Sequence, residues 1–134
     1  MSSDGFTIRL SVNEDTGFIV GGNSFNCLTW MDKMGSSGRA GNKGFPATPR
    51  AGAPIELTAL LYHNLVEYNK LNKEGHFSFS GVKFETHDIT YEYWAKRIQD
   101  NFENYYYIDE KSDKTKYEHI YKDLVFSPSV LYYE

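Results

Sequence analysis

Residues 54–74 read PIELTALLYHNLVEYNKLNKE and contain the clearest periodic pattern in the chain. Apolar residues recur there at helical spacings, and the stripe consists of Ile55, Leu57, Leu61, Leu65, Tyr68 and Leu71, broadened by Ala59, Leu60 and Val66. Proline suits the first turn of a helix, and glycine suits the residue after its last turn. Because Pro54 and Gly75 stand at these two places, the pattern predicts one long helix over 54–74.

A second helix is predicted downstream, over 91–107. Thr90 precedes it as a candidate N-cap, and one face carries Trp94, Ile98, Phe102 and Tyr105. The tyrosine run 105–107 is typical of packing. Between the helices, residues 76–90 alternate short mixed segments and predict a loop with a strand fragment. The tail that follows begins as a charged loop and ends apolar and aromatic.

The N-terminal segment predicts a β-hairpin. Residues 6–12 read FTIRLSV, in which apolar and polar side chains alternate as in a half-buried strand. The turn residues NEDTG follow at 13–17, and the short apolar run FIV comes next. Residues 21–53 then lose both periods and hold most of the glycines. So long a loop is usually functional, disordered or a linker. Its Phe, Trp and Met residues favour a functional loop.

Composition narrows the class of protein. The chain has 134 residues with 14 basic and 18 acidic side chains, a net charge of −4, and 16% aromatic residues. This is the size of one domain, and the acidic surplus argues against a nucleic-acid binder. No apolar run suits a membrane span and no signal peptide is visible, while a lone Cys27 fits a reducing compartment. We therefore expect a soluble, intracellular, globular protein that binds neither nucleic acid nor membrane.

Asp32 is the residue that most suggests chemistry. It lies in TWMDKMG, residues 29–35, between bulky apolar neighbours that would raise the pKa of a carboxylic acid. An acid tuned in this way can protonate a leaving oxygen near neutral pH, and the indole of Trp30 offers a flat face to a sugar ring. The alternative is structural: Asp32 caps the turn or pairs with Lys33 or Arg50.

Other polar residues have two readings as well. Arg50 could bind a carboxylate or sugar hydroxyls, or hold loop carbonyls. Asn26 and Thr29 could donate to hydroxyl groups, although loops use both types for turns. Glu56 falls in the first turn of the predicted helix, where its charge favours the helix dipole. The four histidines are scattered without metal-ligand spacing, so we expect no metal site and no cofactor.

Four segments together resemble one known family. GGNSFNCLTWMDKMGSS at 21–37, GNKGFPATPRAGAPIELTALLYHNL at 41–65, YEYWAKRIQDNFE at 91–103 and IYKD at 120–123 occur in order. They are similar to the C-terminal glucosidase region of the eukaryotic glycogen debranching enzymes. The resemblance runs from about residue 14 to residue 123 and stops after IYKD. The chain departs from the family at Ser24, Leu28 and Ala51, where Arg, Gly and Asp are usual.

The resemblance implies a fold, a substrate and roles for residues. Its fold would be mainly α: residues 1–134 would form an incomplete part of an (α/α)6 barrel, with the N-terminal hairpin and the glycine-rich loop. The family hydrolyses the α-1,6-linked glucose stub of glycogen, with inversion, in the cytoplasm. Asp32 matches its general acid and Trp30 a substrate-pocket aromatic. Arg50 and Glu56 match polar positions that line or support the pocket, and Asn26 and Thr29 stay candidate substrate-binding residues.

A second catalytic carboxylate is missing. An inverting glycosidase needs an acid and a base with carboxyl groups roughly 6.5–9.5 Å apart, so that a water molecule fits between them. In the resembling family the base lies well downstream, and no residue here matches it. We therefore expect this chain to be inactive alone and to need the remainder of a debranching enzyme. The alternative is a noncatalytic glycan-binding or interaction protein from a truncated gene.

Overall fold

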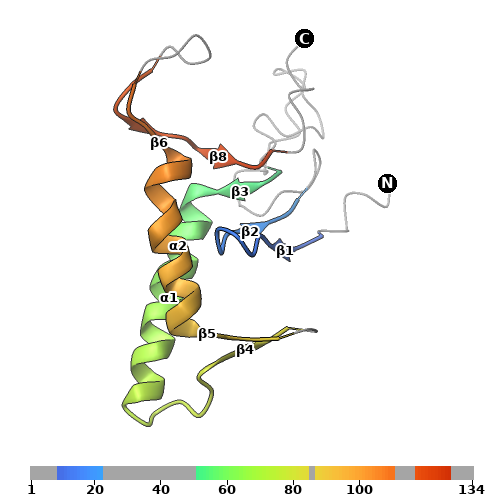
Figure 1. The fold of residues 1–134 in the computed structure, drawn as a ribbon, viewed down its shortest axis with the longest axis vertical. Coiled ribbons are helices and arrows are strands. Elements are labelled where there is room, and N and C mark those ends of the chain that lie inside the picture. Colours follow the sequence, from blue (N-terminus) through green and yellow to red (C-terminus); the bar gives the residue numbers. More distant parts are fainter. Residues whose placement is uncertain (1–8, 23–50, 85–86, 111–116, 128–134) are drawn as a thin grey trace, which may run out of the picture.

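The computed structural model describes residues 9–22, 51–84, 87–110 and 117–127. Its two helices are α1 (Ile55–Lys73) and α2 (Tyr91–Tyr106). They run antiparallel and pack along each other (Figure 1). Short strands lie beside them and at their ends. Neither helix of the described part is long and apolar enough to pass through a bilayer.

The strands pair only in twos, and every pair is antiparallel. β1 (Ser11–Val12) pairs with β2 (Ile19–Val20), and β4 (Gly81–Lys83) pairs with β5 (Asp88–Thr90). The other two pairs join distant segments: β3 (Ala53–Pro54) with β8 (Leu124–Val125), and β6 (Tyr107–Ile108) with β7 (Ile120–Tyr121). In the register, Ala53 faces Val125 and Tyr107 faces Tyr121.

Both helices begin and end close to the predicted residues. α1 ends before Gly75, whose φ of +78° lets the chain turn away, and whose N–H bonds to the carbonyl oxygen of Asn72. α2 is capped as expected, because the Thr90 hydroxyl accepts a hydrogen bond from the Tyr93 N–H at 3.2 Å. The predicted helices are therefore confirmed.

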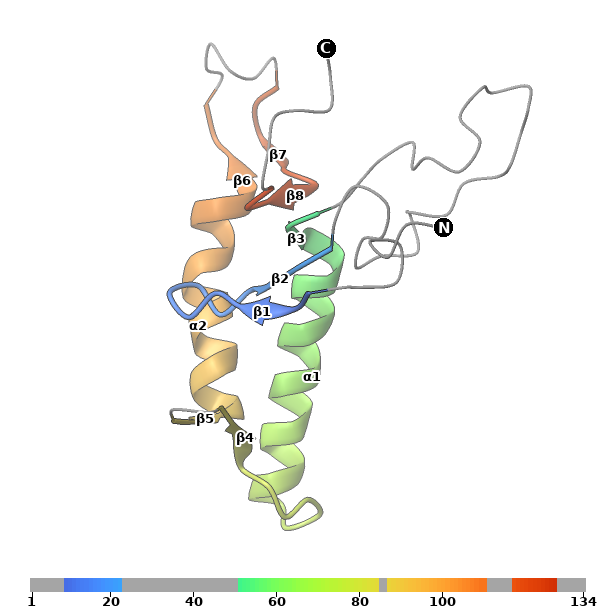
Figure 2. The same ribbon diagram turned by 90° about the vertical axis from the view of Figure 1, so that its right-hand side faces the viewer.

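The hairpin is confirmed at Ser11–Val12 and Ile19–Val20, and it lies across the two helices (Figure 2), whereas residues 6–8 of the predicted strand lie outside the described residues. The side-chain Oδ1 of Asn13 accepts hydrogen bonds from the Asp15 N–H, the Thr16 N–H and the Thr16 hydroxyl, which closes the predicted turn. The indole N–H of Trp94 donates to the Gly17 carbonyl oxygen at 2.7 Å, so α2 holds the hairpin directly. One expectation fails at Leu10, which is 62% exposed instead of facing the core.

The core lies where the hairpin, both helices and β8 meet. Its fully buried side chains include Phe18, Ile98 and Tyr106, and the rest of the cluster comprises Ala53, Leu65, Ile89, Tyr91, Trp94, Ala95 and Val125. The predicted stripe on α1 is only partly correct. Leu65 is buried, but Tyr68 and Leu71 are 44% and 37% exposed, because α2 covers one side of α1 and the stripe was broader than that side.

The described residues therefore form a mixed α/β arrangement and not the mainly helical one that we expected. The difference arises at the helix ends. Dipeptides there, such as Tyr107–Ile108 and Leu124–Val125, are too short for a period to reveal them, and they become strands by pairing with distant segments. The (α/α)6 barrel is not confirmed by this arrangement.

Candidate functional site

Glu56 is the one predicted site residue that the structure describes. Asn26, Thr29, Trp30, Asp32 and Arg50 belong to residues 23–50, outside the described ranges. Glu56 is the second residue of α1 and is half-buried, and its carboxyl oxygen Oε1 is shielded from solvent. A shielded carboxyl oxygen in the first turn of a helix is stabilised by the helix dipole, as the sequence predicts.

Two glycines far apart in the sequence, Gly21 and Gly52, meet near the start of α1. Gly21 and Gly52 exchange two backbone hydrogen bonds, of 3.0 and 2.8 Å, in an isolated antiparallel bridge. Gly52 precedes β3, which leads directly into α1, so the bridge lies close in the chain to Glu56 (Figure 1). The two residues that flank the glycine-rich stretch therefore lie together, near the start of α1.

The start of α1 is held by groups from distant parts of the chain. Pro54 is the N-cap residue and makes no side-chain capping hydrogen bond. Instead the Ile55 N–H donates to the carbonyl oxygen of Asp123 at 3.1 Å, continuing the ladder between β3 and β8. The Asp123 carbonyl oxygen thus satisfies one of the N–H groups at the start of α1 that have no partner within the helix.

A buried hydroxyl pair completes this junction. The Tyr106 hydroxyl donates to the Ala53 carbonyl oxygen at 2.9 Å and lies 2.8 Å from the hydroxyl of Thr58. Thr58 Oγ1 also lies 3.1 Å from the Pro54 carbonyl oxygen. Tyr106 is 0% exposed and Thr58 is 2% exposed, so these contacts are out of reach of solvent.

The roles of Thr58 and Tyr106 were not predicted from the sequence. The tyrosine run was correctly assigned to packing, since Tyr106 is buried, but nothing local shows which hydroxyl bonds to which carbonyl. The sequence offered one usable sign, a threonine four positions after Pro54, the spacing at which a threonine hydroxyl reaches back to a helix carbonyl.

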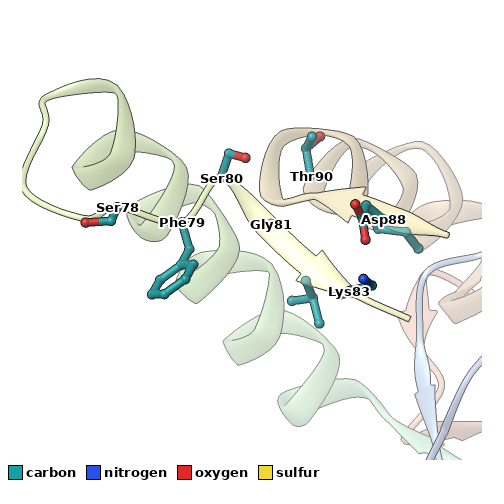
Figure 3. A pocket seen from close by; sticks show the side chains of 9 residues that line it. Ser78, Phe79, Ser80, Gly81, Lys83, Asp88 and Thr90 are labelled. Carbon is teal, nitrogen blue, oxygen red and sulfur yellow. The ribbon is translucent and has the colours of Figure 1, made fainter. Parts of the chain in front are cut away.

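A hollow lies at the opposite end of α1. Its volume is about 270 Å³, and polar side chains of the β4–β5 hairpin and the residues before it line it, including Ser80, Lys83 and Asp88 (Figure 3). It is open to solvent, and the β4–β5 hairpin that lines it lies at the end of α1 opposite to β3 (Figure 1). In the described part of the chain no three His, Cys, Asp or Glu side chains gather as metal ligands would.

Another hollow, of about 570 Å³, opens between the helices. Ala59 and Tyr62 of α1 line it together with Gln99, Phe102 and Glu103 of α2, and its walls are mostly apolar. The Glu103 carboxylate at its edge accepts a hydrogen bond from the Tyr121 hydroxyl at 2.8 Å.

The start of α1 is the best candidate for a functional site within the described ranges. A predicted site residue, Glu56, lies there together with the paired Gly21 and Gly52 and with the buried hydroxyl groups of Tyr106 and Thr58.

Comparison with known proteins identifies the family. The sequence profile of the amylo-alpha-1,6-glucosidase family matches residues 2–130. The glycogen debranching enzyme of Saccharomyces cerevisiae is 46% identical over 113 residues, which is 82% of this chain and 7% of the yeast protein. The chain thus spans only 7% of the length of this relative. A profile match over nearly the whole sequence and an identity this high agree with each other, and the chain belongs to the amylo-alpha-1,6-glucosidase family.

Proposed function

We propose that this chain is part of a glycogen debranching enzyme, and that it contributes to hydrolysis of the α-1,6-linked glucose at a glycogen branch point. The observation that carries the proposal is the 46% identity to the yeast glycogen debranching enzyme over 113 residues. The family match over residues 2–130 supports it. Glycogen or another branched α-glucan is then the ligand, and the cytoplasm is the compartment.

Asp32 is the proposed general acid. It would protonate the oxygen of the leaving sugar while a water molecule attacks the anomeric carbon from the opposite face, which inverts the configuration there. Trp30 would stack on the glucose ring, and Asn26, Thr29 and Arg50 would hold its hydroxyl groups. Glu56 would line or support the same pocket from the first turn of α1, where its Oε1 is shielded from solvent.

The proposed reaction needs a base that these residues do not supply. The base must activate the attacking water from a carboxylate roughly 6.5–9.5 Å from the acid. In the proposal, residues 1–134 are a fragment of the glucosidase domain, and further chain provides the base. The antiparallel pair α1 and α2 would be one hairpin of an (α/α)6 barrel, an architecture built from such pairs.

The test is glucose release from a branched limit dextrin by the protein as its source cells make it. We expect Asp32→Asn to lower kcat by about 100-fold or more, the usual contribution of a general acid, with dextrin binding retained. Asp100→Asn is the matched control, because Asp100 lies exposed on α2 in an ion pair with Lys96 and should leave kcat unchanged.

Two outcomes would contradict the proposal. Full activity of the Asp32→Asn protein would remove Asp32 from the role of acid. Saturable glycogen binding by a parent protein that releases no glucose would favour the alternative, a noncatalytic glycan-binding protein.

A further inference from the structure

We infer that Tyr106, acting with Thr58, is a positioning residue that fixes the first turn of α1 and thereby the carboxyl group of Glu56. The inference rests on the proposed function, in which Glu56 lines or supports the glucose pocket. Tyr106 itself is buried in the core and acts on Glu56 through the backbone of residues 53–55.

The hydroxyl of Tyr106 connects the end of α2 to the start of α1. It donates to the Ala53 carbonyl oxygen at 2.9 Å and contacts Thr58 Oγ1 at 2.8 Å, and Thr58 Oγ1 contacts the Pro54 carbonyl oxygen at 3.1 Å. Two consecutive carbonyl groups just before Glu56 are therefore held by side chains. Glu56 follows two residues after Pro54, so the direction of its side chain depends on this backbone.

Counting hydrogens shows that Tyr106 is the dominant member of the pair. The two hydroxyl groups carry two hydrogens for three contacts, so one contact is without a hydrogen at any moment. While Tyr106 donates to Ala53, Thr58 can donate either to Tyr106 or to Pro54. Loss of the Tyr106 hydroxyl removes the side-chain donor to Ala53 and the partner of Thr58 together, whereas loss of the Thr58 hydroxyl leaves the bond to Ala53 in place.

The hydroxyl can be separated from the packing of the ring. The Tyr106 ring lies 5.2 Å from the ring of Phe18 and 4.9 Å from that of Phe102, measured between centroids. Phenylalanine at position 106 would keep both ring contacts and lose only the polar ones. Tyr106→Phe therefore tests the hydroxyl and leaves the core filled.

The experiment measures kcat and KM for glucose release by the protein as its source cells make it. We expect Tyr106→Phe to raise KM about five-fold, which corresponds to the ~1 kcal/mol typical of one hydrogen bond. Thr58→Val should raise KM less, and Thr58→Ser, which keeps the hydroxyl, should restore it. A purely structural role would lower the amount of active protein and leave KM unchanged.

Tyr105→Phe is the matched control. It is the same chemical change one residue earlier in α2, on a ring that packs against Phe18 and Phe126 but whose hydroxyl makes no hydrogen bond within the described residues. We expect its KM to equal that of the parent. A double-mutant cycle with Glu56→Gln adds the decisive comparison: if Tyr106 acts through Glu56, Tyr106→Phe should raise KM little further in the Glu56→Gln background.

Each result has one meaning. An active parent whose KM does not change in Tyr106→Phe overturns the inference and leaves the proposed function intact. Equal effects of Tyr106→Phe in the presence and absence of the Glu56 carboxylate overturn it too. A parent that releases no glucose overturns the proposed function, and the positioning role falls with it.

Discussion

Tyr121 and Glu103 show how one contact changes a titration. The Tyr121 hydroxyl donates to both carboxylate oxygens of Glu103, at 2.8 and 3.1 Å. This hydrogen bond requires the protonated phenol, and the negative charge nearby opposes formation of a phenolate. The hydrogen bond to Glu103 therefore raises the pKa of Tyr121 above its ordinary value, with smaller contributions from desolvation and from charge.

The raised pKa predicts the direction of a pH effect. The pKa of Tyr121 is higher in the folded protein than in the unfolded chain. The hydrogen bond to Glu103 therefore stabilises the folded state fully below the ordinary pKa of tyrosine, and this stabilisation is lost as the pH rises through the raised pKa. A difference titration of tyrosinate absorbance between the parent and Tyr121→Phe should therefore place Tyr121 above pH 10, about the ordinary tyrosine pKa.

Glu103→Gln is the control for this titration. Glutamine keeps an oxygen that can accept a hydrogen bond but carries no charge, so the pKa of Tyr121 should move back down. An unchanged Tyr121 titration in that variant would show that Glu103 does not cause the shift.

At the scale of elements, two glycines with the same backbone conformation differ in how closely other atoms approach them. Gly17 in the hairpin turn and Gly75 after α1 have nearly the same positive φ, +79° and +78°. A β-carbon on Gly17 would lie 3.1 Å from side-chain carbons of Arg97 and Ile98, whereas one on Gly75 would meet nothing within 4 Å. The hairpin is therefore pressed closely against α2, and the turn after α1 is open.

Alanine substitutions should report this difference. We expect Gly75→Ala to lower the free energy of unfolding by about 1 kcal/mol, the strain of a left-handed backbone alone. Gly17→Ala should cost roughly 3 kcal/mol, because overpacking against α2 is added to the same strain. Denaturant unfolding of both variants in the same protein measures the two costs. Equal costs would mean that the hairpin moves away from α2 easily.

The helices and the short strands differ in whether they could be predicted from the sequence. Both helices could be, because their apolar periods, Thr90 and Gly75 are local features of the sequence. The strands β6, β7 and β8 could not, because each has only two residues and exists through its partner. Burial of α1 was overestimated at Tyr68 and Leu71, because periodicity shows that a face is apolar but not how much of it a neighbour covers.

For the whole molecule, the central prediction concerns the isolated chain. We expect purified residues 1–134 to release no glucose from a branched limit dextrin, because one carboxylate leaves the attacking water without a base. The longer debranching enzyme of which we propose this chain is part, assayed in parallel, is the positive control. Turnover by residues 1–134 that disappears in Asp32→Asn would contradict the requirement for a second carboxylate.

The candidate site divides in the same way between what was predictable and what was not. Glu56 was correctly placed in the first turn of a helix, because its position follows from Pro54 and the apolar period. The roles of Asp32, Trp30, Asn26, Thr29 and Arg50 stay predictions, since these residues lie outside the described ranges. The support behind Glu56, from Tyr106 and from the Asp123 carbonyl, could not be read from any motif.

The sequence by itself determined both helices, the hairpin turn and the family, because capping residues, periods and motifs are carried by neighbouring residues. Only the tertiary structure decided that β8 pairs with β3, that Gly21 meets Gly52 and that Tyr106 reaches Ala53. These contacts join residues far apart in the chain. Their physical reason is shared burial and the need of buried carbonyl and hydroxyl groups for partners, and local sequence does not encode which distant group will satisfy that need.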